Sequence, residues 1–204
     1  MADIVVFHHA QGLTPGVVDF ADGRRCAGHT VRTPDLFEGR TFDTVDQGVG
    51  HAHQIGFDTV IDRGAQAVDG LQAGLVYAGF SLGVLPAQAL ALALTLALAL
   101  ALALTRPGAR AALLFHARVS VYELGTSWPD DLPVQVHAMQ ADPFFVNGGD
   151  LDAARALVDE AADAELFLYP GDLHLFADSS LPSFDAAASA LLTQRVLTFL
   201  ARTR

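Results

Sequence analysis

LVYAGFSLGV, residues 75–84, joins an apolar run to a helical pattern through the motif Gly-x-Ser-x-Gly. The run Leu75–Gly79 is typical of a buried β-strand, and the residues from Val84 onward favour a helix. Two glycines between them allow a sharp turn that holds the intervening serine in a strained, exposed conformation. This stretch therefore predicts a strand, a tight turn that presents Ser81, and a helix.

The same alternation of short apolar runs and longer helical patterns extends along most of the chain. The predicted strands are Ile4–His8, Thr30–Thr33, Leu75–Gly79, Ala111–His116, Val134–Met139 and Leu166–Tyr169. The predicted helices are Pro15–Ala27, Thr44–Leu71, Val84–Thr105, Leu151–Ala162 and Phe184–Arg202. Strands and helices in this order predict an α/β fold, with a mostly parallel sheet flanked by helices.

The composition is that of a compact globular protein. A chain of 204 residues with 51% hydrophobic and 17% charged residues predicts a single domain over residues 1–204. Its formal net charge of -11 argues against nucleic acid as a partner, because phosphate backbones would be repelled. The N-terminus lacks the basic segment of a signal peptide, and the lone Cys26 excludes an intrachain disulfide, so we expect a cytoplasmic location. Cys26 itself is predicted to be a small buried hydrophobe.

Polar residues that follow the predicted strands form the candidate site, because ligands of parallel α/β sheets bind beyond the carboxyl ends of the strands. Ser81, Asp142 and His174 each follow a different strand. A serine hydroxyl becomes a useful nucleophile only beside a general base that a carboxylate orients. These residues therefore supply a candidate catalytic set, and the Leu82 backbone N–H is predicted to face an oxyanion formed on the substrate.

The chain resembles the dienelactone hydrolase family of the α/β-hydrolase fold in three segments: Gly79-Phe80-Ser81-Leu82-Gly83, Ala141-Asp142-Pro143, and Tyr169-Pro170-Gly171-Asp172-Leu173-His174-Leu175-Phe176. The resemblance covers nearly the whole chain except an Ala-Leu run. It implies that Ser81 is the nucleophile, His174 the base and Asp142 the acid that orients the base. It also implies a second oxyanion donor on the loop after the first strand, near Ala10 or Gln11.

Two departures from the family pattern bear on the substrate. Family members commonly carry a cysteine in the turn and a glutamate after the first strand, whereas this chain has Ser81 and, approximately, His9. Dienelactone hydrolases also bring an arginine to the site, but Asp178 follows His174 here. We therefore expect a small carboxylic ester or lactone as substrate and no cofactor. Candidate substrate contacts are His9, Glu38, Arg40 and Arg118.

Several histidines raise the question of a metal site. His51 and His53 are spaced so that their rings diverge on a helix, and His8 and His9 face opposite sides of a strand. We therefore expect no metal. His116 and His137 end or lie within apolar strands, where a hydrogen-bonded core histidine is the expected role.

The run Ala89–Leu104 contains no charged residue, and only Thr95 interrupts its alternation of alanine and leucine. Both residues are strong helix formers, so we interpret the run as an extended apolar helical insertion. Leucine at every second position covers the whole circumference of such a helix. The run spans about 24 Å, which is short for a bilayer, so a membrane span is the less favoured alternative. We expect instead that the helix associates with other copies in a homo-oligomer.

Two functions remain in competition on the sequence alone. The first is a serine hydrolase that cleaves a small ester or lactone through Ser81, His174 and Asp142. The second is a non-catalytic binding or assembly protein, in which the hydrolase scaffold carries the Ala-Leu helix and the catalytic set is misaligned. Reaction of Ser81 with a covalent serine probe separates the two.

Overall fold

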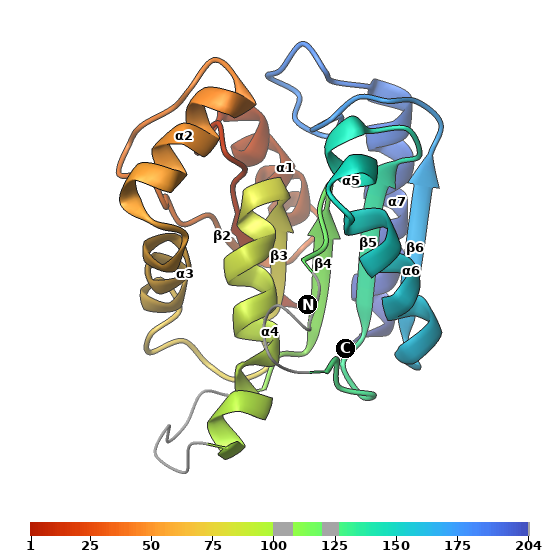
Figure 1. The fold of residues 1–204 in the computed structure, drawn as a ribbon. Helices are drawn as coiled ribbons and strands as arrows, with labels where there is room; N and C mark the ends of the chain where they lie inside the picture. Colours follow the sequence, from red (N-terminus) through yellow and green to blue (C-terminus); the bar gives the residue numbers. More distant parts are fainter. Residues whose placement is uncertain (100–107, 120–126, 204) are drawn as a thin grey trace.

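The computed structural model describes residues 1–99, 108–119 and 127–203. These residues form a six-stranded sheet in the order β2-β1-β3-β4-β5-β6, and all neighbouring strands are parallel (Figure 1). The strands are β1 (Asp3–Phe7), β2 (Thr30–Arg32), β3 (Val76–Phe80), β4 (Ala111–Phe115), β5 (Val134–Met139) and β6 (Ala164–Tyr169). The predicted α/β fold with a parallel sheet is confirmed.

Helices cover both faces of the sheet. The helices are α1 (Pro15–Cys26), α2 (Val45–Ile55), α3 (Phe57–Gln66), α4 (Val84–Ala99), α5 (Pro143–Asn147), α6 (Asp150–Glu160) and α7 (Ala186–Arg202). Successive side chains of a strand point to opposite faces. Accordingly, Val5 and Phe7 of β1 join a core with α3, α4 and α6, whereas Ile4 and Val6 join a second core with α1 and α7. Figure 1 shows α1 and α7 behind the sheet and the other helices in front.

Two differences from the predicted helices have a local cause. The predicted helix Thr44–Leu71 is divided into α2 and α3 at Gly56, whose φ of 87° no α-helix accommodates. The short helix α5 was not predicted, because five residues are too few to show a helical period. It begins where Asp142 accepts a hydrogen bond from the Phe144 N–H and Pro143 takes the first helical position.

The Ala-Leu run is helical as far as the structure describes it. Helix α4 continues to Ala99, and the remainder of the predicted helix, residues 100–105, lies outside the described residues. Val84, Ala87 and Leu90 in its first turns are buried against the sheet. Among the described residues, no helix has the length and apolar character that crossing a bilayer requires. Assembly through the run, and its status as an insertion in a single domain, stay predictions.

Cys26 is exposed, so the prediction that it is buried was wrong. The buried side of α1 carries Val17, Phe20 and Ala21, at the spacing of successive helical turns. Cys26, the last residue of this helix, lies off that side. A lone apolar residue at a helix end carries no periodic signal that would have shown this.

Buried histidines are a notable feature of the sheet. His137 contacts the Tyr169 hydroxyl at 2.9 Å through Nδ1 and the Gln135 side-chain oxygen at 3.1 Å through Nε2, as predicted for a core histidine. His116 was predicted to be hydrogen-bonded as well, and this was wrong: among the residues that the structure describes, neither ring nitrogen has a hydrogen-bond partner. Its ring lies instead among aromatic rings, including those of Phe80 and Phe176.

The ring of His8 connects two strands at their carboxyl ends. Its Nδ1–H donates to the His9 carbonyl oxygen at 2.7 Å, and its Nε2 accepts from the Leu36 N–H at 2.9 Å. Burial lowers the pKa of His8 to about 4 and that of His137 to about 3. Both rings are therefore neutral in the folded protein at neutral pH.

The buried neutral histidines predict a loss of stability in mild acid. Because the folded-state pKa of His8 lies below its ordinary value, the unfolded chain takes up a proton first as the pH falls. The free energy of unfolding should therefore have its full value above about pH 6.5 and decrease as the pH falls toward 4. For His8 alone the decrease is on the order of 3 kcal/mol. Denaturant unfolding measured across this range checks the slope.

A matched pair of variants assigns that slope. His8→Gln retains an oxygen acceptor for the Leu36 N–H without a titrating ring, so its stability should change less between pH 6.5 and 4. His53→Gln replaces an exposed histidine and should keep the wild-type slope. Equal slopes in wild type and His8→Gln would contradict the assignment.

Candidate active site

The turn after β3 holds Ser81 in a strained backbone conformation. Ser81 has a φ of 46°, in the left-handed region that non-glycine residues rarely adopt. The flanking glycines are required by close contacts: a Cβ on Gly79 would lie 2.2 Å from the Gly83 oxygen, and one on Gly83 would lie 2.4 Å from the Phe7 oxygen. The turn therefore packs main chain against main chain, which fixes Ser81 at the carboxyl end of β3.

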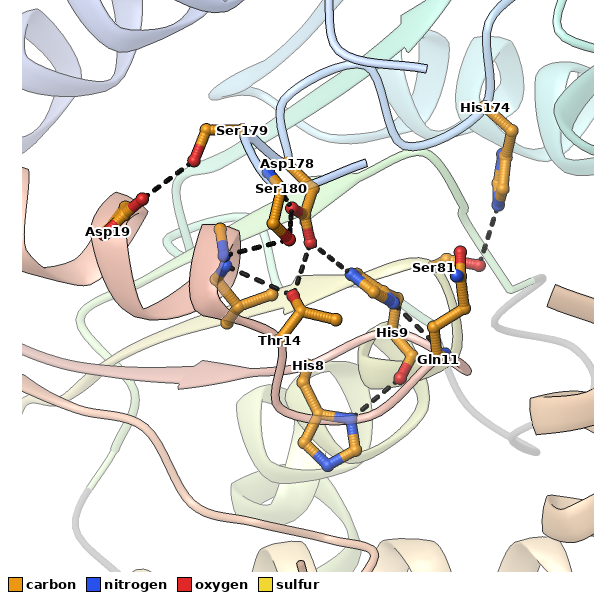
Figure 2. A network of polar contacts seen from close by, with 12 residues as sticks. His8, His9, Gln11, Thr14, Asp19, Ser81, His174, Asp178, Ser179 and Ser180 are labelled. Atoms are coloured by element: carbon orange, nitrogen blue, oxygen red, sulfur yellow. Dashed lines mark hydrogen bonds and ion pairs between the residues drawn. The ribbon is translucent and has the colours of Figure 1, made fainter. Parts of the chain in front are cut away.

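The structure brings together the three residues predicted as the catalytic set. His174 Nε2 lies 3.0 Å from Ser81 Oγ, and His174 Nδ1 lies 2.7 Å from Asp142 Oδ2; Figure 2 shows the first of these contacts. The Asp142 side chain is fully buried, and that of His174 is only 8% exposed. Hydroxyl, imidazole and carboxylate thus form one continuous hydrogen-bonded chain.

The His174 ring is held by neighbours as well as by its hydrogen bonds. The Phe144 ring packs against it at 4.6 Å between centroids, and the His116 ring meets it edge-on at 5.8 Å. Burial holds the pKa of His116 well below its ordinary value, so this neighbour carries no charge at neutral pH. His116 and Leu175 also have positive φ values, of 65° and 60°, so strained backbone gathers around this ring.

Two backbone N–H groups were predicted to face a substrate oxyanion. Leu82 lies in the short 3-10 helix Ser81–Gly83, whose first N–H groups have no partner within the helix. On the loop after β1, the Gln11 N–H already donates to His9 Nδ1 at 3.2 Å. The Ala10 N–H makes no hydrogen bond within the part of the chain that the structure describes. The geometry therefore favours Ala10 over Gln11 as the second donor.

The residues predicted to contact substrate lie in different environments in the structure. His9 is fully buried and both of its ring nitrogens have protein partners, which does not favour contact with substrate, and its assignment stays a prediction. Glu38 pairs with Arg63 at 2.9 Å on the loop after β2. Arg118 is buried near Trp128, and burial lowers its pKa to about 10. Contacts of Glu38, Arg40 and Arg118 with substrate stay predictions.

A second imidazole–carboxylate pair was missed by the sequence reasoning. His9 Nε2 lies 2.7 Å from Asp178 Oδ2, and both side chains are fully buried. Residues 9 and 178 are 169 positions apart, so no local pattern connects them. The only available signal was the presence of an acidic residue four positions after His174. Among the described residues, no group of three or more histidine, cysteine, aspartate or glutamate side chains is arranged to hold a metal.

The sequence as a whole matches one family model. The model of the dienelactone hydrolase family covers residues 2–204. The chain belongs to the dienelactone hydrolase family. No curated protein matches its sequence significantly.

Solved structures related to this dienelactone hydrolase family member share its fold at low sequence identity. A dienelactone hydrolase-like promiscuous phosphotriesterase from metagenomic libraries has 17% identity and a TM-score of 0.66, with 100% of this chain and 87% of the other covered. A thermophilic esterase from Thermogutta terrifontis, solved with propionate, has 17% identity and a TM-score of 0.67, with 98% and 83% covered. These similarities establish the α/β-hydrolase fold.

Packing of α2 against the loop that carries Ala10 predicts a sharp contrast between two glycines. A Cβ on Gly48 would lie 1.8 Å from the Ala10 oxygen, so Gly48→Ala must displace either the helix or the loop. We expect it to lower stability by about 1–3 kcal/mol. Gly50 on the same helix has open space around it, so Gly50→Ala should raise stability by about 0.5–1 kcal/mol. Thermal and denaturant unfolding of both variants measure the difference, and similar effects would show that the contact is unimportant.

Proposed function

We propose that this protein is a serine hydrolase that cleaves small carboxylic esters or lactones. Membership of the dienelactone hydrolase family supports hydrolysis of ester substrates. The observation that carries the finer proposal is the chain of contacts from Ser81 Oγ through His174 to the buried Asp142, at 3.0 Å and 2.7 Å. Such an arrangement activates a hydroxyl that is otherwise a poor nucleophile.

The proposed reaction follows from the position of each proton. His174 Nε2 takes the proton of the Ser81 hydroxyl as Oγ attacks the carbonyl carbon, and the Leu82 and Ala10 N–H groups bind the resulting oxyanion. The oxyanion collapses, the bond to the alcohol oxygen breaks, and His174 returns the proton to that oxygen. Water, deprotonated in turn by His174, attacks the acyl group and releases the acid with Ser81 restored.

Asp142 is suited to hold His174 in the required tautomer. Its Oδ1 accepts from the fixed Phe144 N–H at 3.0 Å, so Oδ2 is directed to His174 Nδ1. A proton on Nδ1 leaves Nε2 free to accept from Ser81. The carboxylate also stabilises the imidazolium that forms during the reaction.

The surface around His174 supports an apolar substrate group. Phe144, two residues after Asp142, is 50% exposed, and Leu173, directly before His174, is 38% exposed. Exposed apolar side chains beside a reactive centre favour contact with hydrocarbon parts of a ligand. The related Thermogutta terrifontis esterase, solved with propionate, is consistent with this substrate class.

The competing assembly hypothesis requires a misaligned catalytic set. The distances of 3.0 Å and 2.7 Å do not favour that alternative. Association of copies through the Ala-Leu run is compatible with hydrolysis, because Ser81 precedes the N-terminus of α4, whereas the run starts at Ala89 and continues to the C-terminal end of that helix. We therefore retain the homo-oligomer as a proposal independent of catalysis.

Substitution of the nucleophile tests the proposal directly. Ser81→Ala should abolish hydrolysis of short p-nitrophenyl esters and labelling by a fluorophosphonate probe. Ser179→Ala removes an exposed hydroxyl that contacts Asp19 and should leave both properties unchanged. Both readouts are taken at the same oligomeric state. Equal activity in wild type and Ser81→Ala, or labelling of neither, would refute the proposal.

The variant Asp142→Asn tests whether Asp142 sets the tautomer of His174, because it leaves the His174 side chain in place. Because the Phe144 N–H keeps an oxygen on its side, the new NH₂ group must face His174 and force the proton onto Nε2. We expect kcat to fall by about 10³–10⁴-fold, since Nε2 can then no longer accept from Ser81. Steady-state kinetics measure this, with circular dichroism as the control for folding. A folded variant with wild-type kcat would exclude Asp142 from the proposed mechanism.

A further inference from the structure

The second imidazole–carboxylate pair, His9 and Asp178, lies between the loop after β1 and the N-terminus of α1. Figure 2 shows His9 directed toward Asp178, with Thr14 and Ser180 around the same carboxylate. Asp178 Oδ2 contacts His9 Nε2 and accepts from the Thr14 hydroxyl, while Oδ1 accepts from the Ser180 hydroxyl and N–H. Both carboxylate oxygens are therefore fully engaged inside the protein.

Asp178 is ionised in this setting. Burial alone would raise its pKa, but hydrogen bonds from His9, Ser180 and Thr14 outweigh burial and lower it to about 2. An ionised carboxylate can only accept hydrogen bonds, so the proton in its contact with His9 resides on Nε2. The neighbouring Gln11 N–H donates to His9 Nδ1, which must be unprotonated. Asp178 thus selects the tautomer that can accept the Gln11 N–H.

The hydrogen bond from the Gln11 N–H to His9 is one of several hydrogen bonds that fix the loop after β1. The Gly12 N–H donates to the His9 oxygen at 3.0 Å, and the Gln11 side chain donates to the oxygens of Phe42 and Asp43. The Gln11 oxygen accepts from the Phe42 N–H at 3.0 Å. With these groups engaged, the Ala10 N–H is a loop donor that stays available to a ligand, since no hydrogen bond engages it within the residues that the structure describes.

We propose that His9 and Asp178 are positioning residues for hydrolysis: by binding the Gln11 N–H they fix the Ala10–Gln11 peptide, and through it they orient Ala10 so that the N–H of the adjoining His9–Ala10 peptide binds the substrate oxyanion. This inference rests on the proposed function. Asp178 acts through His9, and His9 acts through the Gln11 N–H; neither touches the substrate. The pair resembles His174 and Asp142 in chemistry, but it directs a backbone amide instead of a nucleophile.

Two substitutions at His9 separate positioning from simple structural support. The amide nitrogen of glutamine reaches the place of Nε2, so His9→Gln keeps a donor for Asp178 and loses the acceptor for the Gln11 N–H. The amide oxygen of asparagine takes the place of Nδ1, so His9→Asn keeps that acceptor and leaves Asp178 without its imidazole partner. The first variant disturbs the loop, and the second disturbs the buried charge.

A substitution at Asp178 tests the same step through the tautomer. The Ser180 N–H is a fixed donor, so an asparagine at this position keeps its oxygen toward Ser180 and directs its NH₂ group to His9 and Thr14. His9 must then accept at Nε2 and carry its proton on Nδ1. The Nδ1–H and the Gln11 N–H are then two donors facing each other, so the hydrogen bond between them is lost. Asp178→Asn should therefore reproduce the loss seen in His9→Gln.

The experiment compares kcat, KM and Tm of these variants with wild type and Ser179→Ala, on a p-nitrophenyl ester. We expect His9→Gln and Asp178→Asn to lose about tenfold or more in kcat with KM changed less than about twofold, as for loss of an oxyanion donor. His9→Asn should keep kcat within about threefold despite a lower Tm. Ser179→Ala should match wild type. If kcat instead follows Tm across the set, with His9→Asn below His9→Gln, the inference is overturned.

Nuclear magnetic resonance tests the positioning of the loop without relying on turnover, so failure of this inference can be distinguished from failure of the proposed function. Imidazole ¹⁵N shifts should show His9 protonated on Nε2 in wild type and on Nδ1 in Asp178→Asn, together with shifts of the Ala10 and Gln11 amide signals. If wild type lacks turnover that depends on Ser81, the proposed function fails. The catalytic part of this inference then fails with it, whereas the amide signals still decide whether the pair fixes the loop. Unchanged amide signals in Asp178→Asn would overturn the inference even in an active enzyme.

Discussion

The main chain of the turn after β3 lies directly against the carbonyl oxygens that end β1, and the arrangement of the site depends on this contact. Any Cβ at Gly83 would meet the oxygens of Phe7 and His8 at 2.4 Å and 2.6 Å. Because the backbones approach so closely, Ser81 is held at a φ of 46° beside the loop that carries Ala10. The strain is maintained by packing of the two central strands, β1 and β3, which are paired in register through Phe7 and Gly79.

Around this contact the protein uses the same chemical device twice. In each pair a buried carboxylate bonds one imidazole nitrogen, and a fixed backbone N–H on the carboxylate's other oxygen determines its orientation: Phe144 for Asp142, and Ser180 for Asp178. The opposite nitrogen then has one defined role, toward Ser81 in one case and toward the Gln11 N–H in the other. Positions of protons in the site are thus set by main-chain geometry, which loses little freedom during a reaction.

Neutral histidines distinguish this site and the adjoining core from a cluster of charges. His8 and His137 have lowered pKa values because burial disfavours their cationic forms, and His116 is affected in the same way beside His174. His116 therefore packs against the ring of His174 without adding a positive charge. Because acid favours protonation of these histidines in the unfolded chain, low pH destabilises the fold that holds the site, in addition to any effect on the catalytic step.

The sequence alone determined the parallel α/β sheet and the candidate residues Ser81, Asp142 and His174, because strand and helix periods, turn glycines and residues after strands are local patterns. It did not reveal the break at Gly56, although the cause of that break is local. It also did not reveal the exposure of Cys26, or that His116 lacks a hydrogen-bond partner among the described residues, and both of these depend on packing of the folded chain. Only the tertiary structure showed that the Gln11 N–H is engaged by His9, and that His9 is itself buried against Asp178. Those outcomes depend on Asp178, which is 169 positions from His9, and only folding of the whole sheet brings such residues within hydrogen-bonding distance.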